Sequence, residues 1–71
     1  MGGKMARKKN LKEFLSVLGG SPRLIGERFG VSRQAVRMWI VRGKIPYERA
    51  VELERLTEGR VRIEDIRGLI S

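Results

Sequence analysis

The stretch SPRLIGERFGVSRQAVRMWIVRGKIP, residues 21–46, decides how this chain folds. It opens with Ser21, which can accept a hydrogen bond as an N-cap, and Pro22, whose missing N–H costs nothing in the first turn of a helix. Apolar residues then recur as far as Gly30, which interrupts the pattern. The stretch therefore predicts a helix over residues 22–29. Its expected buried side consists of Leu24, Ile25 and Phe29.

A second helix is predicted after a short turn. Ser32 is another N-cap, and Gly43 suits the left-handed conformation that commonly ends a helix. The apolar residues between them lie at helical spacing, at Val36, Trp39 and Ile40. We therefore predict a helix over residues 32–42, in which Trp39 packs in the core and does not stack on bases.

The residues around the turn fit two helices that cross closely. Gly26 lies four residues before Gly30, and so small a residue lets the second helix approach the first. Val31, Val36 and Trp39 supply apolar contacts between the two helices. Two short helices joined in this way predict a helix-turn-helix.

The residues before this pair predict a further helix and a basic arm. Asn10 is a third N-cap, and Glu13, three residues later, completes a capping box. The helix ends at the glycine pair of residues 19–20 and has an apolar side formed by Leu11, Phe14, Leu15 and Leu18. Residues 1–9 have no apolar periodicity and carry four basic side chains, so we predict a disordered arm.

The residues after the pair predict two more helices. One runs from Pro46 to Gly59, with Ala50, Val51, Leu53 and Leu56 turned inward. A short fifth helix is expected over residues 63–70, weakened by Gly68. The sequence thus predicts an all-α fold, a compact bundle of four to five helices that contains a helix-turn-helix, as a single domain over residues 10–71.

Charge is distributed unevenly along the chain. The net charge is +8, which in a chain of 71 residues is typical of a protein that binds a polyanion. Residues 1–44 contain eleven Lys or Arg and two Glu, a balance of +9, whereas residues 45–71 have a balance of −1. Surplus lysine and arginine that only kept the chain in solution would be spread evenly, so we place the polyanion-binding surface in the first two thirds.

Composition also excludes most catalytic chemistry. The chain contains no Cys and no His, which removes thiolate nucleophiles, disulfides, the commonest general base and the commonest metal ligands. Glu48, Glu52 and Glu54 fit a solvated helix face better than a site. No apolar run is long enough for a membrane span, and no signal peptide is evident. We expect a cytoplasmic protein that is not an enzyme and has no cofactor, metal, small-molecule substrate or membrane partner.

The segment GVSRQAV, followed by MW and then IP, resembles the helix-turn-helix of Cro/C1-type repressors, in particular the all-helical phage Cro and YdaS-like regulators. The resemblance covers roughly residues 11–67. It implies a lambda-repressor-like fold and a repressor that binds operator DNA as a homodimer in the prokaryotic nucleoid or a phage-infected host. One departure is Gly26, where that family usually has alanine, a better helix former by about 1 kcal/mol.

The helix over residues 32–42 is the expected base-reading element. If its apolar side faces the core, the opposite side presents Arg33, Gln34, Arg37 and Met38, with Val41 beyond them. Arginine can contact guanine O6 and N7, glutamine can contact adenine N6 and N7, and an apolar side chain can pack on a thymine methyl group. We predict base contacts from these four residues.

Phosphate contacts are expected from side chains that border this helix and from the arm. They would supply affinity but no sequence choice. The predicted set is Ser32, Arg23, Arg42, Lys44, Arg49, Arg7, Lys8 and Lys9.

The last third of the chain leaves two functions open. In the first, Val61, Ile66, Leu69 and Ile70 form the surface of a weak homodimer, unless they only cover the core. In the second, the chain is an antitoxin-like module whose nearly neutral last third binds a partner protein.

Overall fold

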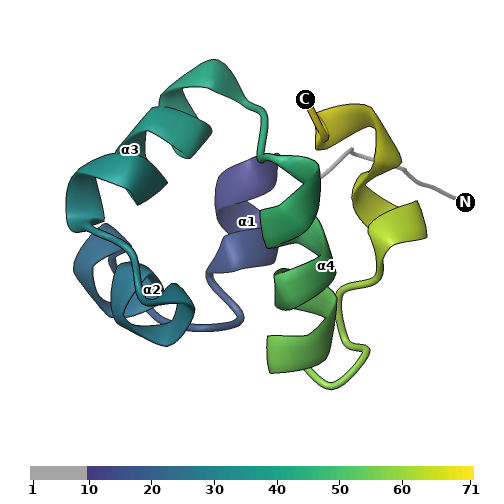
Figure 1. The fold of residues 1–71 in the computed structure, drawn as a ribbon, viewed down its shortest axis with the longest axis horizontal. Coiled ribbons are helices and arrows are strands. Elements are labelled where there is room, and N and C mark those ends of the chain that lie inside the picture. Colours follow the sequence, from purple (N-terminus) through teal and green to yellow (C-terminus); the bar gives the residue numbers. More distant parts are fainter. Residues whose placement is uncertain (1–9) are drawn as a thin grey trace, which may run out of the picture.

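The computed structural model describes residues 10–71, which are helical apart from short connections (Figure 1). Its elements are α1 (Leu11–Leu15), α2 (Pro22–Phe29), α3 (Arg33–Arg42), α4 (Tyr47–Leu56) and the 3-10 helix η2 (Ile63–Leu69). In the part of the chain that is described, strand-like pairing is limited to one parallel bridge between Ile45 and Ile70. The predicted all-α fold is confirmed.

Helix α2 begins and ends at the predicted residues, and α3 begins at Arg33, one residue after the predicted start, and ends at Arg42 as predicted. The Ser21 side chain accepts from the backbone N–H of Leu24 at 3.3 Å, and the Ser32 side chain accepts from that of Ala35 at 3.2 Å. Gly30 and Gly43 end the helices in the left-handed conformation, at φ 77° and 71°. Local capping chemistry therefore sets both helices.

Helix α1 is shorter than predicted. The capping box of Asn10 and Glu13 is present, but the α-helix ends at Leu15. The chain continues in a tighter turn, in which the N–H of Leu18 donates to the carbonyl of Leu15 at 2.9 Å. This turn still brings Leu18 into the core, where it is buried.

One core joins all five elements. Its buried apolar members are Leu11, Leu15, Leu18, Ile25, Phe29, Val36, Trp39, Ile45, Ala50, Leu53, Val61 and Ile66. Leu24 and Val51 were expected inside, but they are 41% and 42% exposed. Each is adjacent in sequence to a buried residue, Ile25 or Ala50, and successive helical residues point about 100° apart, so the neighbour takes the inward position.

The turn between α2 and α3 packs directly on Gly26. A Cβ atom added at Gly26 would lie 2.7 Å from the carbonyl oxygen of Val31 and 3.3 Å from that of Ser32. The two helices also meet through Phe29 of α2 and Trp39 of α3, whose rings pack edge to face with centroids 5.2 Å apart. Even an alanine at this position would force the Val31 carbonyl to move, so glycine is what permits this close approach.

Gly26→Val is expected to lower the free energy of unfolding by about 1–3 kcal/mol, because its side chain must displace backbone atoms of the turn. Urea denaturation followed by circular dichroism measures the change. Gly20→Val is the matched control, because a Cβ atom there meets nothing within 4 Å. Equal stabilities of the two variants would contradict the close approach.

The C-terminal segment covers the core and pairs with the α3–α4 connection. The N–H of Ile45 donates to the carbonyl of Leu69 at 2.7 Å, and the N–H of Ser71 donates to that of Ile45 at 3.0 Å. The predicted fifth helix is therefore the 3-10 helix η2, which is kinked at Ile66. No helix of the described residues is long and apolar enough to cross a membrane.

Two residues of the predicted homodimer surface lie inside the core of the single chain. Val61 and Ile66 are 3% and 1% exposed, and both belong to the core of the single chain. Leu69 and Ile70 are partly buried against the same core. Val61 and Ile66 therefore expose little of their side chains to a second copy, and the homodimer stays a prediction.

Candidate nucleic-acid interface

The exposed side of α3 carries every predicted base-contacting residue. Val36 and Trp39 turn inward, so helical periodicity places the predicted base-contacting side chains on the opposite side. All four are exposed: Arg33, Gln34, Arg37 and Met38. Val41 extends this side and is 79% exposed. We call these five residues the α3 face.

The positive charge of α3 has no ion-pair partner among the described residues. The helix contains three arginines and no acidic residue. None of these arginines forms an ion pair with any residue of the described part 10–71. In α4, by contrast, Glu52 pairs with Arg49 at 2.8 Å and with Arg55 at 3.9 Å. The α3 guanidinium groups are thus available to an external anion or base.

A shallow pocket of about 410 Å³ adjoins the α3 face. It is lined by Arg37, Ile40 and Val41 of α3 and by residues 20–22, where α2 begins. Lys12 of α1 also lines the pocket, although it was not predicted as a site residue. Its position depends on how α1 packs against α3, which no local pattern in the sequence specifies.

The predicted phosphate-contacting residues fall into two groups. Ser32 and Arg42 are exposed at the two ends of α3, and Arg23 remains 67% exposed although it lies 3.4 Å from Glu27. Lys44 instead donates to the carbonyl oxygen of Gly68 at 2.9 Å, and Arg49 is held by Glu52. The first group is thus exposed, with Ser32 and Arg42 at the ends of α3 and Arg23 on α2, whereas the charged groups of the second are held by other parts of the chain. Arg7, Lys8 and Lys9 lie outside the described residues.

Comparison with protein families matches residues 11–69 to the model described as bacterial toxin YdaS. The chain belongs to the bacterial toxin YdaS family. The match runs from the start of α1 to the end of η2, so it includes the α2–α3 pair and the C-terminal segment. No curated protein and no solved structure matches the chain.

Membership of the YdaS family confirms one half of the resemblance stated from the sequence. The YdaS-like part is established, whereas the Cro/C1-type relationship stays a prediction. For this YdaS family chain, the geometry adds a helix face whose arginines have no ion-pair partner among residues 10–71, and a further basic residue, Lys12, at the adjoining pocket. Of the described residues 10–71, no group of acidic side chains could hold a metal ion.

Proposed function

We propose that this chain is a regulator that binds duplex DNA and selects its sequence with the α3 face. One observation carries the proposal. Arg33, Gln34 and Arg37 are exposed together on a helix without acidic residues, and their arginines have no ion pair within the described residues. On an ordinary solvated face, such as that of α4, acidic residues alternate with basic ones.

The geometry of α2 and α3 suits insertion into the major groove. A groove about 12 Å wide admits one α-helix, and the N-terminal half of the second helix of a helix-turn-helix contacts the base edges. Arg33, Gln34 and Arg37 lie in that half of α3. Arginine would select guanine and glutamine would select adenine, each by about 1–3 kcal/mol over the wrong base.

Phosphate contacts in this proposal come from both ends of α3 and from α1. The backbone N–H groups of the first turn and the Ser32 hydroxyl suit a phosphate oxygen, because a helix N-terminus favours an anion. Arg42 is exposed at the end of α3, Lys12 is exposed at the pocket that adjoins this helix, and Arg23 is exposed on α2. In this proposal, Lys12 makes the phosphate contact that was expected from Lys44 and Arg49. The charged groups of Lys44 and Arg49 already have partners within the chain.

Regulation is expected to act through a short operator. A homodimer would bind a pseudo-palindromic site whose half-site centres lie about 34–36 Å apart. Because Val61 and Ile66 are used in the core, we expect such a dimer to be weak and to form mainly on DNA.

Selection of random DNA duplexes on the purified protein tests the proposal. We expect one enriched motif, whose spacing and symmetry report the number of bound copies. Gln34→Ala should lower the ratio of specific to non-specific affinity about tenfold, at the lower end of the range for one lost base contact, and leave non-specific binding nearly unchanged.

Gln34 and Glu48 are both exposed, so Glu48→Ala on α4 is the control and should keep the ratio. Enrichment of no motif, or equal losses for specific and random duplexes, would overturn sequence selection by the α3 face.

A further inference from the structure

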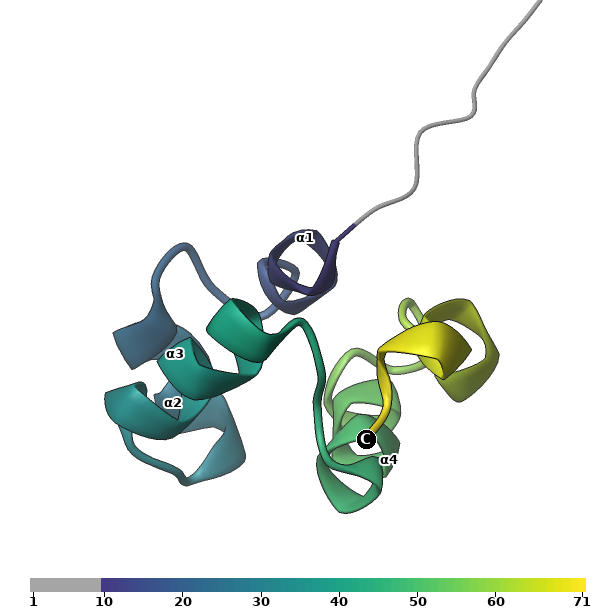
Figure 2. The ribbon, with the colours of Figure 1, turned by 90° about the horizontal axis from the view of Figure 1, so that it is seen from above.

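The chain that leaves α3 is hydrogen-bonded to residues 68–71, which are distant from it in the sequence. The backbone N–H of Ile45 donates to the carbonyl of Leu69 at 2.7 Å, and the N–H of Ser71 donates to the carbonyl of Ile45 at 3.0 Å. In Figure 1, and again in the view from above in Figure 2, the C-terminal end lies beside the start of α4, where this chain arrives from α3. We call residues 43–45 the exit of α3 and residues 68–71 the strap.

A charged side chain fastens the strap as well. The Lys44 ammonium group donates to the carbonyl of Gly68 at 2.9 Å, across 24 positions of the sequence. Hydrogen bonds from charged donors are about twice as strong as those between neutral groups. The strap therefore has two backbone bonds and one charge-assisted bond to the exit of α3.

The two backbone bonds are needed because Ile45 is buried. Its side chain belongs to the core and is 0% exposed, so its peptide groups lie close to apolar surroundings. Buried backbone N–H and C=O groups are nearly always paired, and an unpaired group is costly. The strap supplies the partner of both groups of Ile45. The path of the exit therefore depends on the strap.

Helices α2 and α3 share one local cap, and the strap is added to it at α3. The N–H groups of residues 30–31 donate to the carbonyl of Gly26, at 2.8 and 2.9 Å, and those of residues 43–44 donate to the carbonyl of Trp39, at 2.8 and 3.1 Å. A glycine in the left-handed conformation closes each helix. The end of α2 is therefore a matched comparison for the end of α3.

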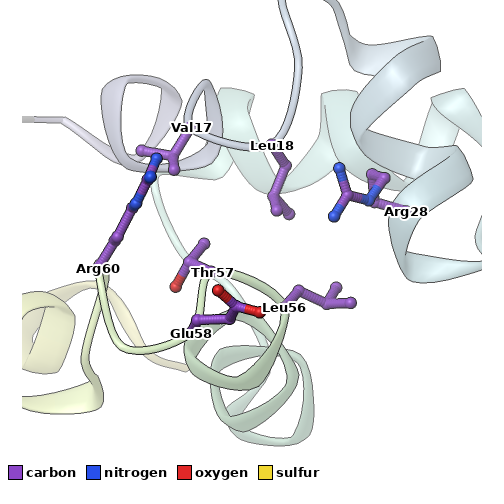
Figure 3. A pocket seen from close by; sticks show the side chains of 7 residues that line it. All are labelled: Val17, Leu18, Arg28, Leu56, Thr57, Glu58 and Arg60. Atoms are coloured by element: carbon purple, nitrogen blue, oxygen red, sulfur yellow. The ribbon is translucent and has the colours of Figure 1, made fainter.

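The end of α4 is held by its own neighbours. The Thr57 hydroxyl donates to the carbonyl of Leu53 at 2.8 Å and accepts from the N–H of Val61 at 3.1 Å. Figure 3 shows Thr57 in this turn and Arg60 on the chain that continues from it. The turn after α4 is thus a second comparison, because its bonds do not involve the strap.

The strap can leave the exit without opening the rest of the core. Ile66, 1% exposed, anchors η2 in the core and has the non-helical angles φ −118° and ψ 22°, so a kink precedes the strap. Within the strap, Leu69 and Ile70 are only partly buried, and the residues on either side of this pair are exposed. Segments with few buried contacts open locally at a lower free energy than the core does. A docked and an undocked strap are therefore the two states of this segment.

We propose that docking of the strap fixes the last turn of α3, so that the docked strap and sequence-selective DNA binding favour each other. The inference rests on the proposed function of the α3 face. Base contacts require side chains held at fixed distance and angle, whereas phosphate contacts carry no sequence information. Undocking therefore lowers selective affinity more than non-specific affinity. Linkage then requires the selected duplex to tighten the strap by the same factor. The last third of the chain thus acts on DNA binding without contacting DNA.

Amide hydrogen exchange of the full chain without DNA tests the strap itself. Ser71→Pro removes the N–H that bonds to Ile45, and the extended conformation of Ile70, at φ −101° and ψ 129°, suits a residue before proline. Ser71→Ala is the matched control, because it keeps this N–H. We expect the N–H groups of Ile45 and Lys44 to exchange about three- to tenfold faster in Ser71→Pro than in Ser71→Ala, as the loss of one hydrogen bond predicts. The N–H groups of residues 30–31 should keep their rates.

A second pair of variants tests the charged bond. Lys44→Met removes the ammonium donor, whereas Lys44→Arg keeps a charged donor. The N–H of Ser71 should exchange about three- to tenfold faster in Lys44→Met than in the unmodified chain, and Lys44→Arg should restore most of the protection. The spectra of the free variants report directly whether each is folded.

Exchange in the presence of DNA tests the coupling. At saturation with the selected duplex, the N–H of Ile45 should exchange at least about threefold more slowly than in the free chain. Random duplex at saturation should slow it much less, because non-specific binding does not need a fixed α3. The N–H of Arg60, which donates to the carbonyl of Thr57 at 3.1 Å in the turn after α4, is the internal control and should keep its rate.

Equal exchange in Ser71→Pro and Ser71→Ala, or an equal acceleration at residues 30–31, would overturn the strap as the support of α3, whether or not the chain binds DNA. An unchanged rate at Ile45 with a bound selected duplex would overturn the coupling and leave the proposed function standing. Equal slowing by selected and random duplexes would mean that DNA covers the strap directly, which also overturns it. Enrichment of no duplex would overturn the proposed function and the coupling together.

Discussion

Trp39→Ala is expected to lower the free energy of unfolding by about 3–5 kcal/mol, as large-to-small changes of buried aromatic residues do. Trp39 is 9% exposed and forms the edge-to-face contact with Phe29 that joins α3 to α2. A domain of this size has about 3–9 kcal/mol of stability in total, so most of it would be lost. Urea denaturation monitored by circular dichroism measures the change.

Two variants control this prediction. Trp39→Phe keeps an aromatic ring beside Phe29 and should cost clearly less than Trp39→Ala. Val41→Ala, on the exposed side of the same helix, should change stability by less than about 0.5 kcal/mol. A Trp39→Ala protein as stable as Val41→Ala would show that Trp39 has no core role and would reopen base stacking as its function.

Arg33→Glu combined with Arg37→Glu is expected to weaken binding to the selected duplex by at least about a hundredfold, because two base or phosphate contacts are replaced by repulsion. Fluorescence anisotropy at fixed salt measures the loss. The slope of log affinity against log salt should also become shallower, since fewer counterions are released.

Arg28→Glu combined with Arg60→Glu is the matched control for the α3 double variant. It changes the net charge by the same amount, and its arginines are likewise exposed and unpaired within the described chain. We expect it to bind the duplex within about threefold of the unmodified chain, because charges beyond a Debye length of about 8–10 Å are largely screened. Equal losses for the two double variants would mean that only total charge matters, and would contradict a specific α3 face.

The boundaries of α2 and α3 could be predicted because they depend on local chemistry. A serine N-cap, a proline in the first turn and a glycine in the left-handed conformation act within one turn of helix. The orientation of α3 could be predicted as well, because the spacing of Val36 and Trp39 determines which side of the helix faces the core. The α3 face was therefore predictable from the sequence to the level of single residues.

Other features depend on contacts between distant segments and could not be predicted. Helix α1 ends early although the apolar spacing continues to Leu18. The Lys44 ammonium group is held by a carbonyl 24 residues away, which no local pattern encodes. For Val61 and Ile66 the sequence left open a dimer surface or a cover over the core, because a sequence does not show how much of an apolar segment one chain can cover.

The central claim is that the α3 face contacts duplex DNA. Amide chemical shifts of the labelled full chain, recorded while the selected duplex is added, test this claim most directly. We predict that the largest changes fall on residues 32–38, with smaller changes at Lys12 and at the start of α2. Largest changes on α4 or on η2, with the α3 resonances unmoved, would contradict it.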